Sequence, residues 1–208
     1  MQYCFLFDGR RCTGCKTCVL ACKDYHDLPS DIAYRQVFEC ETGSWARDEG
    51  GAWSTDGVCY YLSISCNHCQ RPVCVHVCPT GAMHRDDDGF VKVNARRCIG
   101  CGYCAMSCPY RAPHVDRTLG HSVKCDGCAS RVAGGERPVC VEACPQRALD
   151  LATVEEVVGT WGAGDAVPPM PDRELTGPNL VVIAPTCVEQ ADDDLLGQVR
   201  VTNERELV

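Results

Sequence analysis

The sequence predicts an α+β fold of short strands, short helices and long loops, arranged as two related modules. Cysteine occurs 20 times in 208 residues, whereas aromatic residues make up only 7% of the sequence. A protein this poor in large apolar residues needs cross-links other than a hydrophobic core to hold its loops. Sixteen of the cysteines form four tight groups. The segment Arg-Pro-Val-Cys-Val occurs twice, at residues 71–75 and 137–141. The repeat indicates an internal duplication.

The four cysteine groups share two regularities. Each opens with C-x2-C, and its third and fourth cysteines are four positions apart; Pro follows the fourth cysteine in three groups. On a helical turn, residues at i and i+4 are neighbours, about 5–6 Å apart between their Cβ atoms. In sequence order the groups are Cys12, Cys15, Cys18 and Cys22; Cys66, Cys69, Cys74 and Cys78; Cys98, Cys101, Cys104 and Cys108; and Cys125, Cys128, Cys140 and Cys144.

Three chemistries use cysteine at this density. Disulfide frameworks are typical of small secreted proteins, but they give no reason for C-x2-C to recur with a later cysteine before a proline. Zinc takes four ligands from two separated knuckles around one tetrahedral ion, whereas three cysteines at C-x2-C-x2-C form one continuous loop that suits a larger metal centre. The run C-x2-C-x2-C-x3-C-P is the bacterial ferredoxin pattern, in which the fourth cysteine binds the other cluster of a pair. Group three has this run in full, group one lacks only the Pro, and groups two and four have four and eleven residues before the third cysteine. Together the four groups predict four 4Fe–4S clusters in two bacterial-ferredoxin-like modules.

The gap between the second and third groups indicates how the groups pair. It holds residues 79–97, with an alternating stretch at 89–93, which is typical of a hairpin joining two groups of one module. Groups two and three then form one module and groups one and four the other; pairing one with two and three with four is the alternative. The predicted ligands are Cys12, Cys15, Cys18 and Cys144 for cluster a; Cys125, Cys128, Cys140 and Cys22 for cluster b; Cys66, Cys69, Cys74 and Cys108 for cluster c; and Cys98, Cys101, Cys104 and Cys78 for cluster d.

Secondary structure follows from the apolar patterns between the groups. Short helical turns are expected after the third cysteine of each group, as at 19–25, and Thr153 with Glu156 forms a capping-box pattern that predicts a helix toward Trp161. Strands are expected at residues 2–7, 60–65, 90–93, 148–151 and 180–184.

The same patterns divide the sequence into segments. Residues 23–58 and the proline-rich 162–178 are expected on the surface, packed against other elements. The acidic stretch from Asp192 is expected to be extended, either solvated or wrapped around a partner. The expected division is residues 1–25 with 109–152 as the module of groups one and four, 59–108 as the module of groups two and three, 26–58 as an insertion, and 153–208 as a C-terminal helix, strand and tail.

Outside the groups, the sequence contains no arrangement of residues typical of a catalytic site. Because each group already has four cysteines, the six histidines are expected beside clusters rather than as ligands. Arg71, Lys124 and Arg137 adjoin cluster cysteines, where they either offset negative charge or are ordinary surface cations. The remaining cysteines are expected to be plain thiols: Cys4, Cys40, Cys59 and Cys187.

Charge and hydropathy limit the partners. The 20 Lys and Arg residues against 28 Asp and Glu give a formal charge of −8, which argues against nucleic acid because a phosphate-backbone binder carries a basic patch. Residues 1–12 lack the apolar segment of a secretory signal, and the longest apolar run, 180–184, is far shorter than the ~20 residues that span a bilayer. No direct membrane span is expected, so membrane association or export would come through a partner.

Six segments of the sequence carry a family resemblance. They are Arg11-Cys12-Thr13-Gly14-Cys15-Lys16-Thr17-Cys18, Ala21-Cys22-Lys23-Asp24, Tyr61-Leu62-Ser63-Ile64-Ser65-Cys66-Asn67-His68-Cys69, Cys98-Ile99-Gly100-Cys101, Cys108-Pro109-Tyr110, and Lys124-Cys125-Asp126-Gly127-Cys128. With them, about residues 3–185 resemble the iron–sulfur (electron-transfer, beta) subunit of the dimethyl sulfoxide reductase family of molybdopterin oxidoreductases.

That resemblance implies four 4Fe–4S clusters with the same pairing of groups. It also implies, in anaerobic respiration, an electron relay between a quinol-linked membrane anchor, or another donor, and a catalytic molybdopterin (Mo or W) subunit. Nitrate reductase relatives replace the second cysteine of group three by Trp and hold a 3Fe–4S cluster, whereas Cys101 is present here. The implied location is the membrane, reached through partner subunits, on the extracytoplasmic side by co-export or on the cytoplasmic face. A free-standing polyferredoxin and a multi-zinc scaffold are the alternatives.

Overall fold

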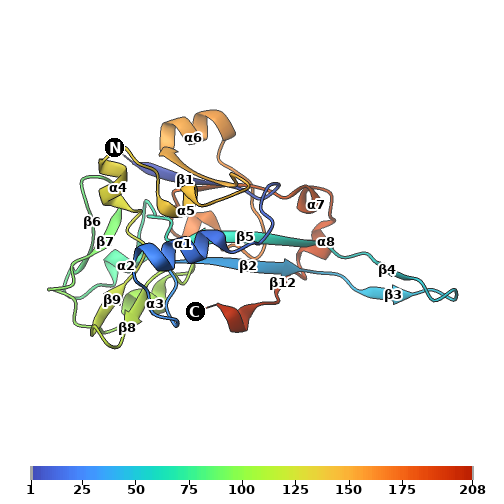
Figure 1. Ribbon diagram of the computed structural model, residues 1–208, viewed down its shortest axis with the longest axis horizontal. Coiled ribbons are helices and arrows are strands. Elements are labelled where there is room, and N and C mark those ends of the chain that lie inside the picture. The colour runs from blue at the N-terminus through green and yellow to red at the C-terminus, as the bar shows by residue number, and fades with distance from the viewer. Residues whose placement is uncertain (1, 208) are drawn as a thin grey trace.

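Two small three-stranded sheets form the frame of the computed structural model, which describes residues 2–207. Short helices and hairpins cluster at one end of this frame, and a thin two-stranded arm projects from the other (Figure 1). The strands are short and the connections long, so the predicted α+β class is confirmed.

The first sheet has the order β10-β1-β11. The central strand β1 (Tyr3–Asp8) pairs antiparallel with β10 (Leu149–Thr153) and parallel with β11 (Leu180–Ile183). Phe5 and Phe7 point toward the main core, while the alternate residues pack under α6 (Val154–Trp161). All three strands lie where the sequence predicts them, because each shows a clear apolar pattern.

The capping box at the start of α6 is also confirmed. The Glu156 backbone N–H donates to Thr153 Oγ1 at 3.3 Å, and the Thr153 N–H donates to Glu156 Oε2 at 3.0 Å. The first turn of the helix therefore has partners for its otherwise unpaired N–H groups.

The second sheet has the order β12-β2-β5, and it corrects one expectation. Strand β2 (Arg35–Glu41) lies within the segment expected on the surface, yet it pairs along its whole length with the predicted strand β5 (Cys59–Ser65). Val37 and Cys40 are buried in the main core. The apolar pattern of this strand is interrupted by Arg35, Gln36 and Glu39. The strand therefore cannot be predicted from its own sequence, because it is stabilised by pairing with β5.

The tail corrects a second expectation. Instead of running extended, it forms α8 (Asp193–Leu196), β12 (Arg200–Val201) and η2 (Glu204–Glu206). The buried Asn203 joins it to β2: its Nδ2 donates to the Val37 carbonyl at 2.9 Å and its Oδ1 accepts from the Glu39 N–H at 2.9 Å. The acidic tail therefore packs on the rest of the same polypeptide. The segment 162–178 packs against other elements as expected, since Val167 is buried and the Tyr60 hydroxyl donates to the Pro168 carbonyl. No helix among residues 2–207 is long and apolar enough to cross a membrane.

The short helices follow one rule. α1, α2, α3 and α5 each begin one residue before the third cysteine of a group and carry that cysteine, two residues earlier than expected. α1 packs against α5, and α2 packs against α3. The remaining elements are α1 (Thr17–Tyr25), β3 (Trp45–Arg47), β4 (Trp53–Thr55), α2 (Val73–His76), β6 (Met83–Arg85), β7 (Val91–Val93), α3 (Tyr103–Ser107), β8 (His114–Asp116), β9 (His121–Val123), α4 (Ala129–Ala133), α5 (Val139–Glu142), η1 (Arg173–Leu175) and α7 (Thr186–Glu189).

Candidate metal centres

Three small cavities each have four grouped cysteines in their walls. Each set combines three cysteines from one group with the fourth cysteine of another, as expected for clusters a, c and d. The three cavities are alike in size. Their cysteines are Cys12, Cys15, Cys18 and Cys144; Cys66, Cys69, Cys74 and Cys108; and Cys78, Cys98, Cys101 and Cys104.

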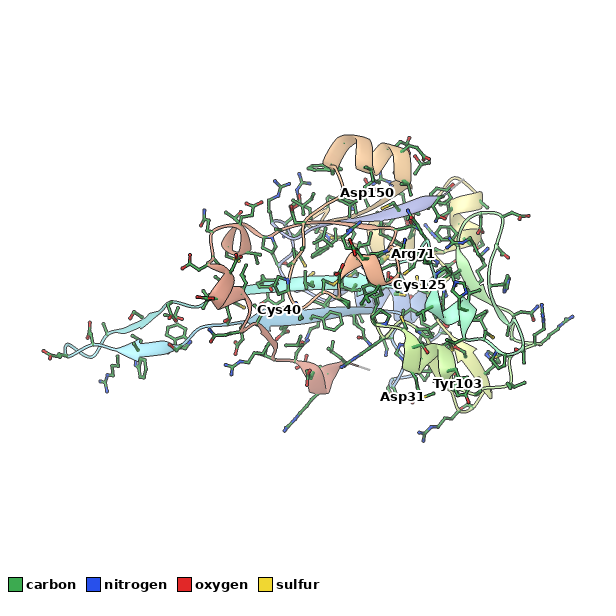
Figure 2. The ribbon with its side chains drawn as sticks, turned by 180° about the vertical axis from the view of Figure 1, so that it is seen from behind. Asp31, Cys40, Arg71, Tyr103, Cys125 and Asp150 are labelled. Atoms are coloured by element: carbon green, nitrogen blue, oxygen red, sulfur yellow. The ribbon has the colours of Figure 1, made fainter. Side chains whose placement is uncertain are left out.

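The other four grouped cysteines also lie together. Burial, and then the neighbouring thiols of Cys140 and Cys128, raise the pKa of Cys22 to about 12. Burial and then Cys22 hold the pKa of Cys125 well above its ordinary value. Figure 2 shows Cys125 within the body of the molecule. This is the set expected for cluster b.

Backbone N–H groups point at several of these sulfurs. Gly127 donates to Cys125 Sγ at 3.4 Å, Ala148 to Cys144 Sγ at 3.3 Å, Met83 to Cys78 Sγ at 3.4 Å and Ser122 to Cys98 Sγ at 3.3 Å. Such bonds favour the thiolate over the thiol. Partial burial of Cys78 acts the other way, but the bonds from Met83 and Thr80 leave its pKa below the ordinary value. Cavities lined by four sulfurs with N–H donors fit a thiolate-ligated cluster.

Neighbouring sets touch, and this gives them a linear order. Cys18 of set a and Cys140 of set b belong to one buried core. Cys125 of set b and Cys66 of set c pack together, as do sets c and d through Cys74 and Cys104. The order is a–b–c–d.

The two ends of this series open to the surface. Among the sixteen grouped cysteines, all of which lie in the described part of the protein, the exposed ones are Cys15 of set a and Cys101 of set d. The cysteines of the two middle sets are buried or half-buried.

Comparison with known proteins identifies the family. Residues 58–154 match a family model described as a 4Fe-4S dicluster domain. Over 181 residues, the protein is 54% identical to the B subunit of the anaerobic dimethyl sulfoxide reductase of Haemophilus influenzae and 52% identical to that of Escherichia coli; each match covers 87% of this protein and 88% of the relative. The protein belongs to this iron–sulfur subunit family.

A more distant member widens the comparison. The thiosulfate reductase electron transfer subunit of Salmonella typhi is 38% identical over 156 residues, or 74% of this protein and 78% of the relative. The protein is therefore an electron-transfer iron–sulfur subunit of the dimethyl sulfoxide or thiosulfate reductase type, and its cofactors are 4Fe–4S clusters. Four cysteine sets are consistent with four of them.

The three cations flagged from the sequence differ in their surroundings. Lys124 is buried, and its Nζ donates to the carbonyls of Cys125, at 2.5 Å, and Val91. Arg71 instead donates to the Glu174 carbonyl at 2.6 Å near the surface. The exposed Arg137 lies 3.6 Å from the half-buried Asp150. Only Lys124 of these three places a buried positive charge beside cluster cysteines.

Two histidines of this family member lie beside candidate ligands. Burial holds the pKa of His68 well below its ordinary value, and its Nδ1 accepts a hydrogen bond from the Val91 N–H at 2.9 Å. The neutral ring then carries its proton on Nε2, which lies 4.0 Å from Cys125 Sγ. His26 Nε2 lies 3.9 Å from Cys128 Sγ. Both positions agree with a place beside the clusters.

The four leftover cysteines lie outside the sets. Cys4 and Cys40 are buried, Cys59 is exposed and Cys187 is half-buried. Burial raises the pKa of Cys4 to about 11 and that of Cys40 to about 12. Figure 2 shows Cys40 on the long strands that lead to the arm.

Sequence reasoning missed one charged residue of this region. Arg35 is 2% exposed and lies among cysteines of sets a and b. No motif flags it, because it stands alone in a polar stretch, and only the pairing of β2 with β5 carries it inside.

Proposed function

We propose that this subunit carries electrons along clusters a, b, c and d between two partner subunits. The observation that carries the proposal is the linear order of the four sets with an exposed cysteine, Cys15 or Cys101, at each end. A relay needs close neighbours along its path and access at both ends. Buried middle clusters limit electron loss to solvent.

The ligand sets follow the same logic. Each cluster takes three cysteines of one group and the fourth of its partner group. The i, i+4 spacing of the third and fourth cysteines places adjacent clusters on one helical turn. The packing of α1 on α5 and of α2 on α3 supports the pairing of groups one with four and two with three. Residues 1–25 with 109–152 and residues 59–108 would be the two modules.

Backbone N–H groups and buried apolar side chains both favour cluster binding at these sites. N–H donors such as Gly127 stabilise thiolate sulfur, and buried apolar side chains such as Phe90 and Val91 keep water away. When bound, each cluster supplies a one-electron carrier.

The two ends differ in surface chemistry. Around Cys101, Ile99, Tyr103 and Met106 are 64%, 53% and 74% exposed, an apolar surface suited to a partner. Tyr103 stands at the edge of the molecule (Figure 2). Beside Cys15, Lys16 pairs with the carboxylates of Glu39 and Glu206. We assign the apolar end to a quinol-linked membrane anchor and the polar end to a catalytic molybdopterin subunit of a dimethyl sulfoxide reductase-like enzyme.

The location follows from these partners. The complex sits at the membrane through its anchor, and the subunit reaches the extracytoplasmic side together with the catalytic subunit. A cytoplasmic orientation is the alternative, and protease protection of the intact complex in oriented vesicles distinguishes the two.

Metal analysis of the purified complex tests the clusters. About sixteen irons and sixteen sulfides per subunit are expected for four 4Fe–4S clusters; zinc without acid-labile sulfide would sink the proposal. Cys101→Ser should alter the EPR signal of cluster d and leave the other three. The matched control is Cys59→Ser, since Cys59 is also exposed but lies outside every set. An unchanged spectrum in Cys101→Ser removes Cys101 from the ligands.

Co-purification tests the partners. The tagged subunit should bring down a large subunit that contains molybdopterin, together with a membrane protein. Recovery as a monomer that retains all four clusters would favour the free-standing polyferredoxin instead.

A further inference from the structure

Arg35 is a buried cation whose charge is not balanced by a carboxylate. It lies at the start of β2, opposite Ser65 in β5, and is 2% exposed. Among the described residues no Asp or Glu forms an ion pair with it. Burying an unpaired charge is strongly unfavourable, so the protein must supply negative charge in another form.

Neutral groups fix the guanidinium in place. Nη1 donates to the Ser63 carbonyl at 3.0 Å and to Ser63 Oγ at 3.2 Å, and Nη2 donates to Ser65 Oγ at 2.9 Å. The guanidinium carbon lies 5.3 Å from the centre of the Phe5 ring. Nε has no hydrogen-bond partner although it is buried. An unmet buried N–H is costly, and cluster sulfur would be an acceptor for it.

Ser63 connects the guanidinium to set a. Its Oγ accepts from Arg35 and lies 3.3 Å from Cys18 Sγ. Since the oxygen already accepts from Arg35, its proton is free to point at the sulfur. Ser63 thus links the guanidinium of Arg35 by hydrogen bonds to Cys18, a candidate ligand of cluster a.

Electrostatics joins Arg35 to set b as well. Although burial opposes its charge, the thiolates of Cys140 and Cys18, followed by those of Cys125 and Cys22, hold the pKa of Arg35 above its ordinary value. Cys18 belongs to set a and the other three to set b. An oxidised 4Fe–4S cluster with four thiolates carries a charge of about 2−, so two such clusters supply the missing countercharge.

We propose that Arg35 is a positioning residue shared by clusters a and b, which stabilises the added electron on either of them and so raises both reduction potentials. A fixed positive charge favours the more negative, reduced state, and it acts strongly where the effective dielectric constant is low. The proposal rests on the ligand sets of the proposed function. It adds a residue that supplies no ligand yet affects two neighbouring clusters and spares cluster d.

The test is an EPR-monitored redox titration of the purified holo-complex with Arg35→Gln and Arg35→Lys. In Arg35→Gln, the equilibrium constants for reducing clusters a and b should fall at least tenfold, which is 59 mV for a one-electron couple. Arg35→Lys, which keeps the charge, should lie nearer the wild type. Cluster d is the internal control. Arg47→Gln is the matched control variant, because Arg47 lies on the exposed arm over Trp53.

Each result bears on the proposal. A fall of less than tenfold in the equilibrium constants of clusters a and b in Arg35→Gln, or equal shifts of all four clusters, would overturn it. Arg35→Gln could lose clusters a and b, in which case the iron content would fall from about sixteen toward about eight per subunit. Arg35→Lys then distinguishes two explanations. Restored clusters with near-normal reduction potentials support a role for the positive charge, whereas continued loss of the clusters shows that Arg35 acts only through its shape and overturns the proposal. A wild-type complex lacking four clusters would fail the proposed function itself, before any Arg35 variant is made.

Discussion

Gly127 offers a sharp test of how closely the cluster loops are packed. It lies between Cys125 and Cys128 with φ +75°, and a Cβ added there would lie 2.4 Å from the Phe90 ring. Phe90 is 1% exposed, stacks on Tyr3 at 5.2 Å and meets the edge of His68 at 4.8 Å. The ring therefore has no free space into which to move.

The expected cost of Gly127→Ala has two parts. An L-residue in the left-handed region costs about 1–2 kcal/mol, and overpacking a filled core costs typically about 1–3 kcal/mol more. The sum is about 2–5 kcal/mol. The displaced backbone would also weaken the hydrogen bond from the Gly127 N–H to Cys125 Sγ. Cluster b should therefore be the first cluster to be lost.

Gly135→Ala is the matched control. Gly135 has φ +79°, but an added Cβ would meet nothing within 4 Å, so only the backbone part of the cost remains. Urea denaturation followed by the visible absorbance of the clusters should rank wild type first, Gly135→Ala second and Gly127→Ala last. The double variant Gly127→Ala/Phe90→Leu should recover part of the loss. A Gly127→Ala protein as stable as Gly135→Ala would refute the reasoning.

Four further predictions concern residues outside the cysteine sets. Thr153→Ala should lose about 1 kcal/mol through the capping box, while Thr153→Ser keeps it; equal urea midpoints for all three proteins would show that the cap contributes nothing. Deleting residues 44–56 removes the arm where its two strands come together, since a Cβ on Gly43 would lie 2.3 Å from Gly57 Cα. Iron content and EPR signals should stay unchanged, because the arm is expected to play no part in cluster binding. Loss of any cluster would contradict this expectation. With clusters intact, iodoacetamide should modify Cys59 well before Cys40, as read by peptide mass spectrometry. Because burial raises the folded-state pKa of Cys40 to about 12 from 9.0, the folded protein keeps a proton that the unfolded protein loses. The stability this thiol contributes is present below pH 9 and is lost toward pH 12, and denaturation midpoints of Cys40→Ala should fall less steeply over that range.

The local features of this protein follow its sequence closely. The strands at β1, β5, β7, β10 and β11 and the capped helix α6 lie where their patterns predict them, because alternation and capping act over a few residues. The two errors have a common cause. β2 and the tail are polar in pattern and are ordered only by pairing with segments distant in sequence: Arg35 faces Ser65, and Asn203 bonds to Val37 and Glu39.

The chemistry of this protein can be predicted from its cysteine pattern, since thiolate spacing along a loop dictates which metal centre the loop can hold. The fold decided what lies between and around the centres. It set the order of the four cysteine sets, left Cys15 and Cys101 exposed at the two ends, and brought Arg35 beside cysteines of two sets. These properties depend on contacts between residues distant in sequence, which tertiary packing creates and which no local pattern encodes.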